Sequence, residues 1–187
     1  MVRLERIGLR PLTTASRFGR DRSGFSAVEF ALVLPLMMLL FLGGTELGDA
    51  LTIDRKVTHA ASALGDLVAQ SRTISDHDMD DILDAVTAII APYDQDKLRI
   101  RVTGVAIDSK GKATVAWSDA RNDIPAVMGT AVSLPAGVGQ PNSFVVATEV
   151  HYEYTPAYGY VMTGSFDLNH SFHLRPRAGD KVERVAG

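Results

Sequence analysis

Glu29 is the only ionisable residue in the apolar run from Phe25 to Gly44. A carboxylate opposes insertion of such a segment into a bilayer, because an unpaired charge in hydrocarbon is strongly unfavourable. Either the segment stays out of the membrane, or Glu29 reaches water at the membrane surface, or it has a partner of opposite charge. The residues around Glu29 therefore form the first candidate site.

The rest of the chain offers little that is typical of an active site. It has five histidines and no cysteine, and it contains no HExxH, GxSxG or phosphate-binding glycine motif. His170 and His173 are three residues apart, so strict alternation places them on opposite faces of a strand. We predict a non-enzymatic protein without metal or cofactor. A membrane-anchored hydrolase that uses His and Asp stays an alternative, because any globular domain contains these residue types.

The acidic run DHDMDD follows Ser75. It lacks the glycine and the distal glutamate of a calcium-binding loop. Ser75 can instead cap the free N–H groups of a helix, and acids in the first turns favour the positive end of the helix dipole. The run therefore predicts a helix start rather than a metal site.

The apolar run has the length of a membrane span. Twenty residues rise about 30 Å in a helix, which matches the hydrocarbon core of a bilayer. A buried helix of a soluble domain is the alternative, but few such helices are apolar on every face. We therefore divide the chain into a basic leader (1–24), a transmembrane helix (25–44), an amphipathic extension (45–72) and an α+β domain (73–187).

Charge orients this arrangement. Residues 1–24 carry a net charge of +4 within a chain of net charge −3, so everything after Gly24 sums to −7. Five Lys or Arg residues precede the span within 5–24, and two follow it within 45–64. The positive-inside rule places the leader in the cytoplasm and the C-terminal domain across the membrane. The acidic remainder argues against nucleic-acid binding.

The start of the chain differs from an ordinary secretory signal. Its apolar core is longer than the usual 7–15 residues, and no convincing small-x-small cleavage site follows it. The sharper junction lies before the apolar run, at Gly24-Phe25. Gly24 followed by FSAVEF resembles a type IV prepilin cleavage site, in which glycine precedes the cut and glutamate is the fifth residue of the mature chain.

The longer string GFSAVEFALVLPLMMLLFLGGTELGDAL resembles the start of the TadE/TadG-like family, pilin-like proteins of the bacterial tight-adherence (Flp pilus) machinery. The resemblance covers about 50 residues closely, with weaker similarity in YTP at 154–156 and LRPR at 174–177. It implies a pilin-like fold and a bacterial inner-membrane protein with a periplasmic C-terminal domain. It also implies a minor or accessory role, since major Flp pilins are much shorter.

The resemblance assigns roles to residues of the opening segment. A prepilin peptidase would cut between Gly24 and Phe25, creating an α-amine that is largely protonated at neutral pH. Glu29 could pair with that amine in its own chain, as residue i+4 on the same helix face, or in a neighbouring subunit. The expected partners are the peptidase, other pilin-like subunits and the pilus assembly platform. The leucines expected to contact lipid and later neighbouring helices are Leu32, Leu34, Leu36, Leu39, Leu40 and Leu42. The alternative is an unprocessed, signal-anchored periplasmic binding module.

The helical pattern continues past the span. An apolar stripe at helical spacing predicts an amphipathic extension that packs on the following domain. Its members are Leu47, Leu51, Val57, Ala61, Leu64 and Val68. The helix that begins at Ser75 is expected to bury a second set, Ile82, Val86, Ile89 and Ile90.

Four strands follow, as two hairpins. The segments 97–108, 113–120, 143–155 and 164–174 alternate apolar and polar residues. Residues 119–142 are expected to form a loop with a short helix around 125–130. We predict an α+β domain with a four-stranded antiparallel sheet packed on the helices. Four tyrosines at 152, 154, 158 and 160 either pack in the core or form a contact surface for other subunits.

Overall fold

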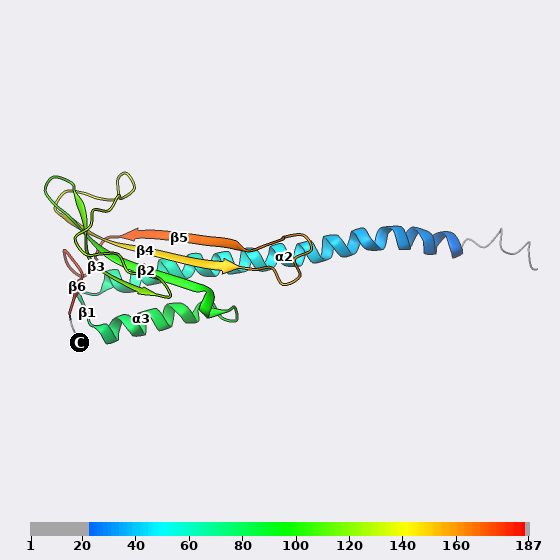
Figure 1. Ribbon diagram of the computed structural model, residues 1–187, viewed down its shortest axis with the longest axis horizontal. Coiled ribbons are helices and arrows are strands. Elements are labelled where there is room, and N and C mark those ends of the chain that lie inside the picture. The colour runs from blue at the N-terminus through cyan, green and yellow to red at the C-terminus, as the bar shows by residue number, and fades with distance from the viewer. Residues whose placement is uncertain (1–22, 186–187) are drawn as a thin grey trace, which may run out of the picture.

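A single helix, α2, forms the axis of the molecule (Figure 1). The computed structural model describes residues 23–185, so all but the end of the predicted leader lies outside the described residues. α2 runs from Ser23 to Gln70 and includes Pro35. Its 48 residues correspond to about 70 Å at 1.5 Å per residue. Figure 1 shows the first half of α2 extending well beyond the rest of the fold.

The second half of α2 packs on the sheet through one apolar stripe. Ile53, Val57 and Leu64 are fully buried on this face. The sequence assigned Leu47 and Leu51 to the stripe, and this was wrong: they are 53% and 51% exposed. At about 100° per residue, Leu51 lies roughly 120° around the helix from Val57 and cannot share its face.

The second helix, α3, spans Asp76–Ala88 and begins as the sequence predicts. The hydroxyl of Ser75 accepts a bond from the Asp78 N–H at 3.2 Å, and the Asp78 carboxylate accepts one from the Ser75 N–H at 2.9 Å. This reciprocal capping box confirms that the acidic run starts a helix. The buried face differs in part from the prediction, because Ile82 and Ile89 are only half-buried. The buried side chains on this side are Met79, Leu83, Val86 and Ile90.

The main sheet has four antiparallel strands in the order β3-β2-β4-β5. Their bounds are Leu98–Ile107 (β2), Ala113–Arg121 (β3), Ser143–Tyr154 (β4) and Phe166–Leu174 (β5). β2 follows a short 3-10 turn, η1, at Gln95–Lys97. The two hairpins and the α+β class are as predicted. The sequence did not predict a small parallel pair of β1 (Thr73–Ile74) and β6 (Glu183–Arg184).

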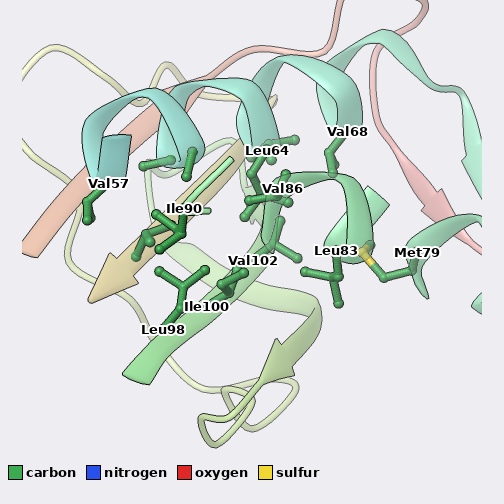
Figure 2. Close-up of a cluster of buried hydrophobic side chains, with 14 of the residues drawn as sticks. Val57, Leu64, Val68, Met79, Leu83, Val86, Ile90, Leu98, Ile100 and Val102 are labelled. Atoms are coloured by element: carbon green, nitrogen blue, oxygen red, sulfur yellow. The ribbon is translucent and has the colours of Figure 1, made fainter. Parts of the chain in front are cut away.

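The core lies between the two helices and one face of the sheet. Figure 2 shows Val57, Leu64 and Val68 of α2 meeting side chains of α3 and of β2, with Ile90 among them. The five side chains predicted to share one face of β4 are all buried: Val146, Thr148, Val150, Tyr152 and Tyr154. Thr148 is satisfied within this core, because its hydroxyl donates to the Ala61 carbonyl of α2 at 3.1 Å. That bond joins helix and sheet at the centre of the domain.

The other face of the sheet is partly covered by the loop 122–142. Val132, Leu134 and Val138 of this loop pack on a second buried cluster, formed by Val105, Ile107, Ala113, Val145 and Ala147. The short helix expected around 125–130 is not formed. The loop backbone instead bonds to the edge of β3, with Val115 N–H donating to Thr130 O and Val132 N–H to Ala113 O.

Candidate functional site

The first half of α2 presents an apolar surface that the described chain does not cover. Every side chain from Phe25 to Phe41 is exposed. An 18-residue window of this helix has a mean hydropathy of 2.3 and none of it is buried. The helix is therefore long and apolar enough to cross a membrane.

The predicted helix-packing leucines lie on this surface. Five of them are exposed and Leu42 is half-buried. At about 100° per residue, Leu32, Leu36 and Leu39 share the helix face that carries Val57 further along, whereas Leu34 lies on the opposite side. The face that packs on the chain's own sheet thus continues, uncovered, into the apolar half.

Gly24, Phe25 and Glu29 lie at the start of α2. Gly24 is in its first turn, and Phe25 and Glu29 are one turn apart on one continuous helix. Both side chains are exposed. Among the described residues no basic side chain lies within ion-pair distance of Glu29. Their roles in cleavage and charge pairing stay predictions.

Glu46 is a buried carboxylate just beyond the apolar run. It is 1% exposed, and among the described residues no cation contributes to its pKa shift. Its carboxylate accepts three backbone N–H bonds: from Met162 at 3.0 Å, Val161 at 3.2 Å and Tyr160 at 3.2 Å. These bonds, that of Met162 foremost, hold the pKa of Glu46 below its ordinary value, while burial acts in the opposite direction. The charge is stabilised by backbone dipoles.

The donors belong to the loop between β4 and β5, residues 155–165, which we term the β4–β5 loop. Figure 1 shows this orange loop beside α2, where the helix leaves the sheet. A Cβ placed on Gly43 would stand 3.0 Å from Val161 Cγ2, so loop and helix are in close contact there. The four tyrosines singled out in the sequence fall into a buried pair and an exposed pair. Tyr152 and Tyr154 are buried in the core, whereas Tyr158 and Tyr160 are 58% and 75% exposed.

Comparison with known proteins bears on this helix. Residues 24–65 match the family model of TadE-like proteins. The predicted resemblance is confirmed for this TadE-like segment, which lies wholly within α2. No curated protein and no solved structure matches the chain. The TadE-like segment contains Gly24, Phe25 and Glu29 as well as Glu46, and it ends before the sheet begins.

Sequence reasoning missed Glu46. The sequence feature that could have revealed its burial is its position two helical turns before Ile53, on the packing face of the TadE-like segment. A charged residue is normally assigned to the exposed side, and backbone donors from a distant loop leave no pattern in the sequence. The sequence thus located the TadE-like segment but not its contact with the β4–β5 loop.

Several other titratable side chains form ion pairs at separate places in the domain. His170 was expected on an exposed strand face, but it is half-buried against the helix, with Nε2 2.7 Å from Asp54 Oδ1. Arg184 bonds to Asp119 and Asp76, each at 2.8 Å, and ties the C-terminal strand to α3 and β3. Within residues 23–185, no group of three or more His, Asp or Glu side chains is placed to hold a metal. These pairs link elements of the fold.

Proposed function

We propose that the protein is a pilin-like minor or accessory subunit for assembly of a bacterial Flp-type (tight-adherence) pilus, without enzymatic activity or cofactor. The observation that carries this proposal is the TadE-like segment itself: a helix whose first half is apolar and uncovered and whose second half packs on an α+β domain. A subunit of this shape can be held in a membrane and then transferred to neighbouring helices through the same surface.

The proposed location is the bacterial inner membrane. With a span at 25–44, the positive-inside rule favours a cytoplasmic leader and a periplasmic sheet domain. The basic residues nearest the span support this orientation, because five Lys or Arg lie within 5–24 and only two within 45–64. The proposed partners are the prepilin peptidase, other pilin-like subunits and the assembly platform, with no nucleic acid.

The proposed processing site is the Gly24-Phe25 bond. Cleavage there removes residues 1–24 and leaves Phe25 with a positively charged amine. That amine and the Glu29 carboxylate would neutralise each other, within one chain or between adjacent subunits, and the cost of holding either in an apolar environment would fall. The exposure of Glu29 on the helix surface supports pairing with a group from outside the described chain.

The leucine-bearing surface provides the contact for assembly. Its exposed side chains meet lipid before assembly and neighbouring helices afterwards, which exchanges one apolar environment for another. Packing and charge pairing, rather than the hydrophobic effect, would then drive helix association. In this proposal Glu29 makes the helix contact specific, and the leucines provide most of the contact area.

Intact-mass measurement of the protein purified from its native membrane tests the proposal. We expect a chain that begins at Phe25 and has lost residues 1–24. Recovery of the uncut chain from a cell with an active prepilin peptidase would contradict the processing step and favour the signal-anchored binding module. Retention in the membrane fraction after a carbonate wash, with the sheet domain accessible to protease only from the periplasmic side, checks the span and its orientation.

A further inference from the structure

The β4–β5 loop lies at the level where the apolar run ends. Val161 packs against Gly43, in the last apolar turn of α2, and Glu46 binds the loop backbone one turn later. If residues 25–44 span the hydrocarbon core, Gly43 lies at its boundary with the headgroup layer. The loop then lies at that boundary as well, on the side where the sheet domain is attached.

The composition of the loop differs from that of the rest of the domain. Residues 155–165 read TPAYGYVMTGS and contain no Asp, Glu, Lys, Arg or His. Three of its larger side chains are substantially exposed: Tyr158, Tyr160 and Val161. Tyrosine is enriched at membrane surfaces, because its ring favours the apolar side and its hydroxyl favours the hydrated headgroups. An uncharged loop with two exposed tyrosines at the end of a span has the chemistry of a lipid contact.

Glu46 gives the loop a fixed position. Three consecutive N–H groups point to one carboxylate, so the segment from Tyr160 to Met162 is held on the helix rather than free in solvent. The loop N–H groups bond directly to the carboxylate, which is an advantage close to a low-dielectric layer. The Tyr154 hydroxyl also donates to the Glu46 carbonyl, at 3.4 Å, and links the same helix turn to the end of β4.

We infer that the β4–β5 loop lies in the headgroup layer of the bilayer and seats the sheet domain against the membrane surface. Tyr158, Tyr160 and Val161 are the contact residues, and Glu46 is the positioning residue. The lipid surface is the occupant, because the loop is continuous in space with the end of the span. This inference rests on the membrane span in the proposed function.

A depth measurement on the full chain tests it. The protein has no cysteine, so single-cysteine variants Tyr158→Cys, Leu40→Cys and Ile124→Cys can each carry one environment-sensitive fluorophore. Ile124 is the matched control, since it is 78% exposed on the loop 122–142. The labelled proteins are reconstituted into phosphatidylcholine–phosphatidylglycerol vesicles that contain lipid with a spin label either near the headgroup or near the end of the acyl chain.

The three positions are expected to give three different results. The probe at 40 is quenched most by the deep spin label, the probe at 158 most by the shallow one, and the probe at 124 by neither. Glu46→Ala in the protein labelled at 158 weakens the shallow quenching, while the same change leaves quenching at 40 intact. Circular dichroism of the Glu46→Ala protein establishes that the helices are retained.

The failures are distinguishable. A probe at 158 that resembles the one at 124, while the probe at 40 is quenched, overturns the lipid contact and leaves the span in place. Emission at 158 that depends on protein density in the vesicle and not on the spin label also overturns it, in favour of a second copy as occupant. An unquenched probe at 40 overturns the membrane span, and this inference with it.

Discussion

Gly104 of β2 lies directly against the indole of Trp117 in β3. A Cβ on Gly104 would overlap Trp117 Nε1 and would stand 2.7 Å from Phe144 Cζ. The ring has little freedom to move away, because Trp117 is 7% exposed and its Nε1 donates to the Val182 carbonyl at 2.8 Å. The close packing of the indole therefore requires glycine at position 104, and the same indole joins the sheet to the C-terminal segment through its bond to Val182.

Gly104→Ala is expected to destabilise the domain by about 1–3 kcal/mol, as overpacking of a filled core does. Trp117 is the single tryptophan of the chain, so its fluorescence reports the displacement of the ring as well as thermal unfolding. Gly48→Ala is the matched control, since a Cβ there meets nothing within 4 Å. As an exposed helical site it should be neutral or stabilise by up to about 1 kcal/mol. Equal unfolding temperatures for Gly104→Ala and wild type would contradict this packing.

Leu64→Asp tests whether α2 is part of the domain core. Leu64 of α2 is fully buried against the rest of the domain. An aspartate at this position would therefore bury a carboxylate without a partner. We expect a loss of stability on the order of 3 kcal/mol or more. Leu67→Asp is the matched control, because Leu67 is on the same helix but 40% exposed. Thermal unfolding in detergent should separate the two variants, and a similar loss in both would mean that the effect comes from the helix and not from its packing.

The strand pattern of this fold could be predicted because it depends on local alternation. β4 has five inward residues at a spacing of two, from Val146 to Tyr154, and all five are buried. The start of α3 was also legible, since Ser75 and Asp78 are three residues apart and cap each other. In both cases the interacting groups lie close together in the sequence.

Features that depend on distant contacts were not predictable in this way. The Glu46 site joins α2 to backbone groups more than a hundred residues later. The parallel pair β1 and β6 consists of two residues each, too short for a periodic signal. Leu47 and Leu51 were wrongly assigned to the buried stripe because they fit an approximate helical spacing. The position of the sheet decides which helix face is buried, and both leucines are exposed.

Glu46→Gln should weaken the attachment of the β4–β5 loop to α2 and remove a pH dependence of thermal unfolding. Glutamine keeps one acceptor oxygen but turns an amide N–H₂ toward backbone donors, so at least one bond is lost. The folded pKa of Glu46 is lowered below the ordinary pKa of a glutamate, so its contribution to stability is complete above that ordinary pKa and declines as pH falls toward the folded pKa. Thermal unfolding of both proteins should differ most near pH 6–7 and converge on acidification. A difference that stays constant down to acidic pH would contradict the carboxylate as its cause.

Gly24→Leu is expected to block processing. The peptidase must accommodate the residue before the cut, and a bulky side chain there would obstruct access to the backbone. We expect the variant to be inserted in the membrane as a full-length precursor, visible by immunoblot and by intact mass. Gly44→Leu is a suitable control: a Cβ on Gly44 meets nothing within 4 Å, and the site is distant from the cut. A mature-sized product from Gly24→Leu would place the cut elsewhere or exclude it.

Glu29→Ala should act at a later step than Gly24→Leu. Removing the carboxylate makes the span more apolar, so insertion is not reduced, and the glycine before the cut is intact, so the chain is at least partly processed. The new amine of Phe25 then has no carboxylate to pair with in its own chain or in an adjacent subunit, and an isolated charge opposes lateral packing. We expect mature-sized protein in the membrane together with loss of pilus-dependent surface adhesion.

Glu29→Asp is the informative companion variant, because it keeps the charge on a shorter side chain and should recover part of the adhesion. If the role of Glu29 were purely steric, Glu29→Asp would lose adhesion as Glu29→Ala does. Normal adhesion in both Glu29→Ala and Gly24→Leu, with both proteins at wild-type size, would show that the segment is only an anchor.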